Sequence, residues 1–100
     1  MTAEPYRIEW RPMAREDLHA IVRYIGKDNP TKAKSFSQKL RDKAEQLAQH
    51  TELGRHGRPG LPEWLRQLVV HLNYTFFHRV VTVIYTIEIL RVKHAARQIP

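Results

Sequence analysis

The chain has 100 residues, 42% of them apolar and 27% charged, which is enough for one small domain with one core. It has no cysteine, which excludes a disulfide framework and a thiolate metal site, and it has no apolar run long enough to span a membrane. Seventeen Lys and Arg against ten Asp and Glu give a net charge of +7, which favours a polyanionic partner: nucleic acid, a ribosome or an acidic protein segment. Because the polar start of the chain is unlike a secretory signal, we expect a cytoplasmic protein.

The first half of the chain predicts a strand followed by two helices. Residues 6–10 alternate between apolar and charged side chains, as in a strand with one buried face. Pro12 stops this strand and suits the first turn of a helix, and Gly26 is typical of a helix end. Asn29 and Pro30 suit the N-cap and first position of a second helix, in which apolar residues at helical spacing continue to about position 50. Two amphipathic helices joined by a short turn form a helical hairpin.

The second half predicts a loop and three strands. Residues 54–62 hold three Gly and two Pro, which favours a loop. Strands are expected over 65–74, 75–81 and 83–92, with a turn at Asn73-Tyr74 and another near Thr82.

This order predicts an α+β fold with a single domain over residues 1–100. A helical hairpin packs on one face of a small, mostly antiparallel sheet, in the order β-α-α-β-β-β. In the last strand Ile87 and Ile89 should face one side of the sheet, and Glu88 and Leu90 the other. The face without helices would be partly open, and a partner or substrate could bind there.

Basic residues dominate the second half. After Gly54 only Glu63 and Glu88 are acidic. The basic residues of this half are Arg55, Arg58, Arg66, Arg79, Arg91, Lys93 and Arg97. Arg55, Arg58 and the neighbouring His56 fall in the expected loop. We therefore expect a polyanion-binding surface in this half, and the alternative is a solvated basic surface with no partner.

Three segments resemble the RelE/ParE superfamily of toxins. The opening "YRIEWRPMAREDLHAIVRYIGKDNPTKAKSF" is similar to the first strand and helical hairpin of those proteins. The stretch "LGRHGRPGLPEWLRQLVVHLNYTFFHRV" resembles their loop and central strands, and "IEILRVKHAARQIP" resembles their C-terminal strand. Together the segments cover nearly the whole chain, in the family's order. The resemblance implies a type II toxin–antitoxin system in which the free toxin inhibits growth.

Activities differ within the superfamily, because RelE-like members cut messenger RNA on the ribosome and ParE-like members poison DNA gyrase. RNA cleavage needs a base, a cation for the phosphorane and an acid for the leaving oxygen. In RelE-like toxins the cation is commonly an Arg early in the second strand of the meander. Thr75 occupies the matching position here, and it brings no charge. This departure favours a ParE-like inhibitor that needs no catalytic residues.

The alternative ribonuclease would use His94 for proton transfer, with Arg79 or Arg91 as the substitute cation. His94 could equally cap the last strand, and each Arg could be solvated or paired with Glu63 or Glu88. An inactive homologue that serves only as an antitoxin-binding co-repressor is a third possibility. None of these functions calls for a cofactor, and the six His show no ligand spacing for a metal.

The expected partner is a cognate antitoxin whose acidic, amphipathic segment wraps the toxin. The residues proposed to bind the antitoxin or the target are Arg66, Arg79, Arg91, Lys93, His94 and Arg97. Operator DNA would be bound only through the antitoxin, as the resemblance implies. Of the remaining candidates, His71 and His78 are expected in the core or at its rim, and Trp64 is expected to pack under the loop.

Overall fold

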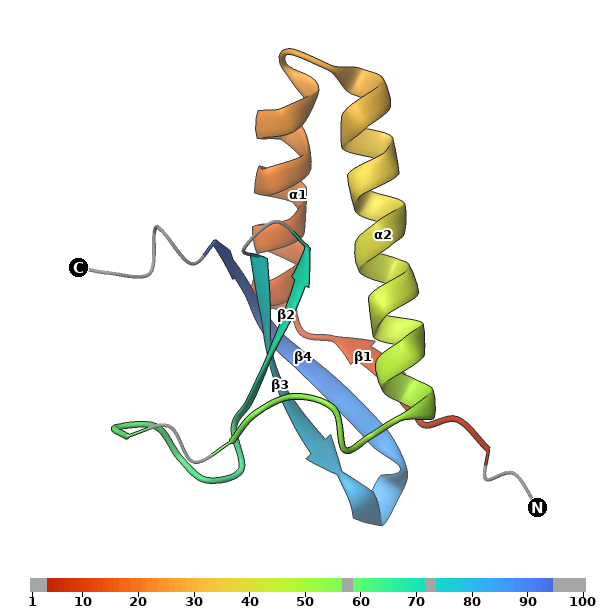
Figure 1. The fold of residues 1–100 in the computed structure, drawn as a ribbon, viewed down its shortest axis with the longest axis vertical. Coiled ribbons are helices and arrows are strands. Elements are labelled where there is room, and N and C mark those ends of the chain that lie inside the picture. Colours follow the sequence, from red (N-terminus) through yellow and green to blue (C-terminus); the bar gives the residue numbers. More distant parts are fainter. Residues whose placement is uncertain (1–3, 57–58, 72–73, 95–100) are drawn as a thin grey trace.

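The computed structural model describes residues 4–56, 59–71 and 74–94, and it confirms the predicted α+β architecture (Figure 1). The elements are β1 (Arg7–Trp10), α1 (Pro12–Gly26), α2 (Pro30–Gln49), β2 (Arg66–His71), β3 (Tyr74–Val81) and β4 (Thr86–His94). A 3-10 turn, Thr82–Ile84, joins β3 to β4, close to where the sequence predicts a turn. Tyr74 starts β3 instead of lying in a turn, and Asn73 lies outside the described residues.

The two helices begin where the sequence predicts. Pro12 and Pro30 occupy first-turn positions, where the amide hydrogen that proline lacks would have no helical partner. The Asn29 side chain accepts a hydrogen bond from the backbone N–H of Lys32 at 3.0 Å and caps α2. Within the described ranges, neither helix is long and apolar enough to cross a membrane.

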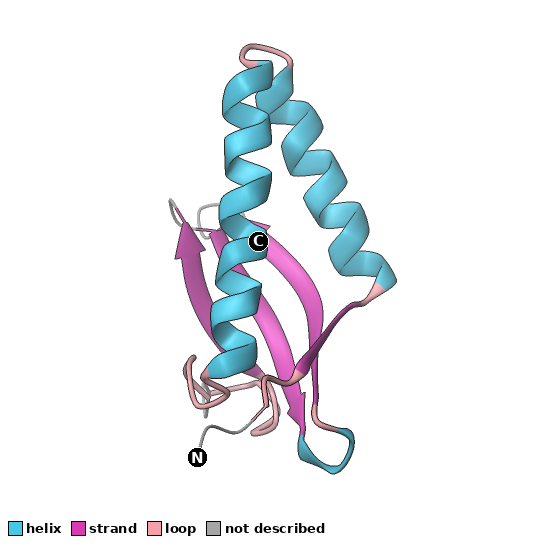
Figure 2. Ribbon diagram, turned by 90° about the vertical axis from the view of Figure 1, so that its right-hand side faces the viewer, coloured by secondary structure: helices cyan, strands magenta, loops and turns pink. Residues whose placement is uncertain are grey.

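The four strands form one mixed sheet in the order β1-β4-β3-β2. The β1–β4 pair is parallel, and the β4–β3 and β3–β2 pairs are antiparallel. Both helices lie on the same side of this sheet, as Figure 2 shows. Within the part of the chain that the structure describes, no helix covers the other side of the sheet, as predicted for the open face.

The core lies between the helices and the sheet. Leu18 of α1 and Phe36 and Leu40 of α2 are buried against Phe76 and Ile89 of the central strands. Phe76 also meets Trp10 edge to face, with the ring centroids 5.5 Å apart. Burial of each large apolar side chain contributes about 1.5–3 kcal/mol, so this layer supplies most of the energy that holds the hairpin on the sheet.

A β-bulge in β4 decides which side chains face the helices. Phe77 is opposite Arg91 and His78 is opposite Ile89, so Leu90 is an extra residue with no partner in β3. Strict alternation from Ile87 and Ile89 would turn Arg91 toward the helices. The bulge instead turns Arg91 to the open face and buries the next residue, Val92, in the core.

Candidate functional site

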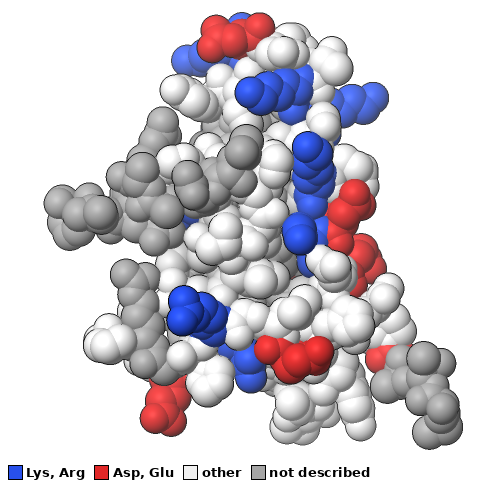
Figure 3. All heavy atoms as spheres, viewed as in Figure 1, with Lys and Arg blue, Asp and Glu red and all other residues white. Residues whose placement is uncertain are grey.

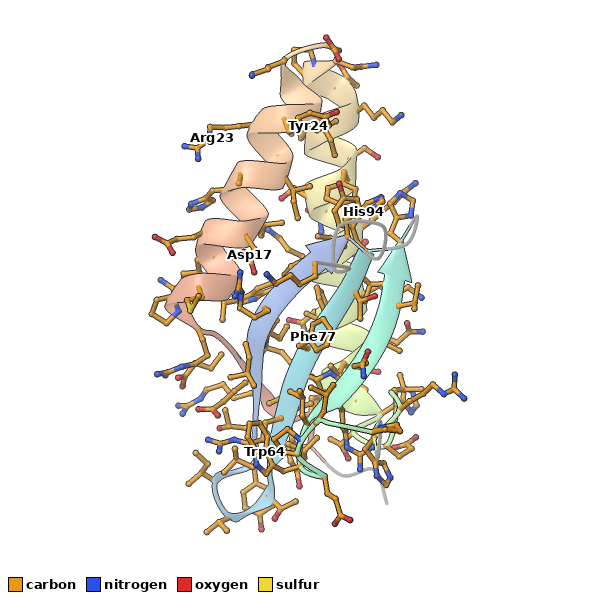
Figure 4. All side chains as sticks on the ribbon, turned by 90° about the vertical axis from the view of Figure 1, so that its left-hand side faces the viewer. Asp17, Arg23, Tyr24, Trp64, Phe77 and His94 are labelled. Carbon is orange, nitrogen blue, oxygen red and sulfur yellow. The ribbon has the colours of Figure 1, made fainter. Side chains whose placement is uncertain are left out.

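The open face of the sheet is built from alternate residues of the three C-terminal strands. Thr75, Phe77 and Arg79 of β3 lie opposite Lys93, Arg91 and Glu88 of β4, respectively. Side chains of directly opposed residues share a face, so these six lie together on the side without helices. Gln67 and Val69 extend the same face onto β2. Figure 4 looks onto this face, with Phe77 near its centre.

Arg79 is held by an acidic neighbour on the next strand. Its Nε and Nη2 atoms donate to the same Glu88 oxygen, at 3.0 and 2.6 Å. The guanidinium carbon also lies 5.4 Å from the centre of the Trp64 ring, a cation–π distance. The prediction that Trp64 is a core residue packed under the loop is wrong, because Trp64 is 52% exposed and its ring lies against Arg79.

Arg91 is paired with Asp17 of α1, a partner that the sequence does not indicate. Its Nε and Nη2 atoms donate to the two Asp17 oxygens at 2.8 and 3.0 Å. The Asp17 carboxylate also accepts the Val92 backbone N–H at 2.9 Å, at the part of the β4 edge that lies beyond the end of β1. Burial raises the pKa of Asp17, but the hydrogen bonds from Arg91 and Val92 outweigh it, and the pKa is lowered overall. The hydrogen bonding between Arg91 and Asp17 also raises the pKa of the Arg91 guanidinium.

Thr75, at the position where RelE-like toxins commonly carry an arginine, is buried with 6% exposure. It lines a cavity of about 790 Å³ together with Gln67, Val69 and the loop residues Arg55 and His56. Backbone hydrogen bonds of 2.8 Å in both directions between Arg55 and Gln67 fix this loop to β2. Two exposed basic side chains, Arg55 and His56, therefore flank the cavity; Arg58, the third predicted loop residue, lies outside the described residues.

His94 does not join the two arginines. It lies opposite Tyr74, whose ring is buried among the helix-facing residues, and the two ring centroids are 4.8 Å apart. His94 is therefore on the helix-facing side at the end of β4, whereas Arg79 and Arg91 are on the open face. The sequence places all three in one hypothetical catalytic set, and the structure does not bring them together.

The remaining predicted residues are spread over the molecule. Arg66 donates to the backbone oxygen of Glu52 at 3.3 Å and so ties β2 to the end of the helical hairpin. Lys93 is half-buried on the open face beside Thr75. Arg97 lies outside the described residues. No group of three or more His, Asp or Glu suited to a metal occurs within the ranges that the structure describes.

His78 is confirmed as a core residue and is the most unusual titratable group in the fold. It is fully buried, and among the described residues neither ring nitrogen has a hydrogen-bond partner of good geometry, although both the Leu53 and Phe76 backbones are close. Burial, followed by the charge of Arg66, lowers its pKa to about 4. Gly54 lies against the imidazole with φ +97°, and a Cβ there would come within 2.9 Å of the ring.

The chain resembles known toxins over most of its length. Residues 8–99 match the sequence model of the family described as ParE toxin of type II toxin–antitoxin system, parDE. Toxin RelE2 of Caulobacter vibrioides is 36% identical over 88 residues, which cover 88% of this chain and 91% of the relative. Toxin RelE3 of the same organism is 31% identical and covers 88% of this chain and 92% of its own.

Two solved toxin–antitoxin structures also contain a chain with a similar fold. A chain of the chromosomal ParDE toxin–antitoxin system from P. aeruginosa superposes with a TM-score of 0.73 at 26% identity, over 92% of this chain and 98% of that one. A chain of the toxin–antitoxin complex RelBE2 from Mycobacterium tuberculosis superposes with a TM-score of 0.66 over 90% of this chain and 91% of its own. At 23% identity, the second likeness concerns the fold alone.

Proposed function

The chain belongs to the ParE toxin family of type II toxin–antitoxin systems, and from this we propose that it inhibits bacterial growth by acting on DNA gyrase. In this proposal the protein binds its target in the cytoplasm and catalyses no reaction. A cognate antitoxin neutralises it, and the pair binds operator DNA only through the antitoxin.

The observation that carries this proposal is the composition of the open face. A ribonuclease of this fold needs a cation for the phosphorane and a proton donor or acceptor within reach of the same phosphate. Thr75 supplies no charge, and Arg79 and Arg91 are each occupied by a carboxylate of the same chain. His94 lies on the opposite side of the sheet. An inhibitor that acts by binding requires none of these groups, so the arrangement favours gyrase over messenger RNA.

The partner is supported by a structural relative. A chain that is 26% identical to this one belongs to a ParDE toxin–antitoxin system. An antitoxin with an acidic segment would also complement the charge of +7 carried by this chain, and opposite charges of this kind accelerate association.

The target is tested with purified components. We expect the isolated chain to inhibit gyrase-catalysed supercoiling of a relaxed plasmid and to accumulate cleaved DNA, with no cutting of messenger RNA on programmed ribosomes. Addition of the antitoxin should restore supercoiling. Cleaved messages with normal supercoiling would replace the proposal with the ribonuclease alternative. Expression without antitoxin and without any growth defect would identify an inactive co-repressor.

Substitution of His94 separates the two active alternatives further. His94→Ala should leave growth inhibition within about twofold of the parent chain, whereas removal of a general acid or base costs roughly 100-fold or more in a cleavage reaction. Circular dichroism should be recorded for this variant, because His94 packs on Tyr74. A folded His94→Ala protein that has lost toxicity would contradict the non-catalytic mechanism.

A further inference from the structure

A second cavity lies on the other side of the molecule, between the helical hairpin and the end of the sheet. We call it the hairpin cleft; its volume is about 570 Å³, and its walls include Tyr24 of α1, Phe36 of α2 and His71, Tyr74 and His94 of the strands. Phe36 lies 5.0 Å from Tyr74 and 5.6 Å from His71, measured between ring centroids. The cleft therefore has an aromatic floor, in contrast to the loop-lined cavity beside Thr75.

The rim of the hairpin cleft is positively charged. Lys32 and Lys39 line it and are both exposed; seven residues apart, they lie on the same face of α2. Neither forms an ion pair with another described residue. Asp28 is the single acidic residue among the described lining residues, so the charge of the rim stays positive. Figure 3 shows the corresponding column of Lys and Arg side chains over α2.

The histidine in the floor responds to this charge. Burial lowers the pKa of His71, and the charges of Lys39 and Lys32 lower it further. A positive potential therefore reaches into the cleft, where a carboxylate of a ligand would meet it. A potential that disfavours a second positive charge favours an anion.

We infer that the hairpin cleft receives an acidic segment of the antitoxin, with one apolar side chain against the aromatic floor and carboxylates on Lys32 and Lys39. This inference rests on the pairing with an antitoxin in the proposed function and does not depend on gyrase as the target. Amphipathic segments bind in this way, with apolar anchors in a groove and charges at its rim.

The floor favours a peptide side chain over a nucleotide base. Phe36 and Tyr74 are 4% and 9% exposed, and their rings meet at 66°. Neither ring offers the free flat surface on which a base stacks in single-stranded nucleic acid complexes. An aliphatic or aromatic side chain, by contrast, can fit against the edges of such rings.

The test uses charge reversals on one helix. The probe is the purified cognate antitoxin of the proposed function, titrated calorimetrically. Lys32→Glu with Lys39→Glu is compared with Lys34→Glu and Arg41→Glu, a pair that has the same spacing and charge change but lies outside the hairpin cleft. All four positions are exposed, and surface substitutions away from packed contacts usually change stability little, so both proteins should fold.

We expect the Lys32/Lys39 variant to bind the probe about tenfold more weakly or worse, and the control to change by less than about threefold. The apolar contact is tested in the same titration. Tyr24→Ala, in the wall of the hairpin cleft, should weaken binding of the probe. Tyr85→Ala, at a similarly exposed tyrosine in the β3–β4 turn, should not. Equal losses in both charge variants would overturn the inference, as would no binding of the probe by the parent chain.

Two further measurements distinguish an antitoxin site in the cleft from a nucleic-acid site and from a failure of the proposed gyrase target. If the Lys32/Lys39 variant loses binding to a 12-nucleotide single-stranded RNA but keeps the protein probe, the cleft is a nucleic-acid site and the inference is wrong. Gyrase inhibition by each free variant is recorded alongside. Loss of the probe with no gyrase inhibition by the parent chain would refute the proposed target and leave the cleft assignment standing.

Discussion

The two faces of the sheet are made by the same strands but are stabilised by different interactions. On the face that the helices cover, Phe76, Ile89 and Val92 are buried, and even a histidine, His78, is buried there with no well-aligned hydrogen bond to any described residue. On the open face most side chains of β3 and β4 are polar or charged, and each of the two central arginines has its own carboxylate. The first face depends on burial, and the second depends on ion pairs.

The comparison shows that a count of basic residues does not locate a binding surface. Arg79 and Arg91 are prominent in the sequence, yet Glu88 and Asp17 neutralise them within the chain. Lys32 and Lys39 belong to a helix whose charges look mixed in the sequence, yet no ion pair within the described residues satisfies them. The positive charge available to a partner is therefore set by pairing in three dimensions.

The largest effect should come from a pair of neighbouring phenylalanines. Phe76→Ala empties a fully buried core position and should lower the free energy of unfolding by about 4 kcal/mol. Phe77→Ala, one residue along and on the open face, should cost about 1 kcal/mol, because Phe77 is already partly exposed to water. Urea unfolding of both variants measures the difference, and equal losses would mean that the two faces do not differ as described.

The buried histidine should make the covered face sensitive to acid. The folded-state pKa of His78, about 4, lies below its ordinary value of 6.5, so between these values the unfolded chain binds more protons. The stability of the native protein is retained above pH 6.5 and falls by roughly 3 kcal/mol as the pH drops to 4.

His78→Leu should remove most of this loss when unfolding is followed by urea titration at pH 7, 5.5 and 4. The lowered pKa of His71 acts in the same direction and contributes to what remains. An unchanged pH profile in His78→Leu would assign the sensitivity to other groups.

The two ion pairs of the open face should differ from each other. Asp17→Asn weakens two bonds to Arg91 and one to the β4 edge, and we expect it to cost about 2 kcal/mol at pH 7. Since the pKa of Asp17 is lowered, its contribution persists above the ordinary value of 3.8 and is lost as the pH falls through the folded-state pKa.

Glu88→Gln should cost about 0.5 kcal/mol, because Arg79 is more exposed and only one carboxylate oxygen accepts its bonds. Thermal unfolding of the two variants at low and high salt ranks the pairs. A larger loss for Glu88→Gln than for Asp17→Asn would reverse our assignment of the stronger pair.

Local signals in the sequence are sufficient for the elements and their order. The prolines and Asn29 define the helix starts, and the apolar spacing defines the buried faces of both helices. Alternation correctly places Ile87 and Ile89 on the same side of the sheet, and the structure shows that this side is the core. Each of these signals depends on residues that are close together in the sequence, so it can be recognised without a structure.

The arrangement of the site depends on contacts between distant positions. Asp17 and Arg91 are 74 residues apart, and no local pattern pairs them. The prediction for Trp64 fails because an aromatic residue beside a strand usually packs inward. Here the Arg79 guanidinium provides a contact for its ring at the surface. The side on which His94 lies follows from a single extra residue in β4, whose position the alternation alone does not reveal.

That extra residue also bears on how the protein can change by mutation. Because of the bulge at Leu90, Arg91 lies on the open face and Val92 in the core, and point substitutions preserve this register. Regular pairing of Leu90 with β3 would exchange the two sets of side chains beyond it and drive the Arg91 guanidinium toward the core. Loss of Leu90 would instead remove the bulge and leave both sets on their present faces, so the chemistry presented to a partner depends on the bulge that accommodates this residue.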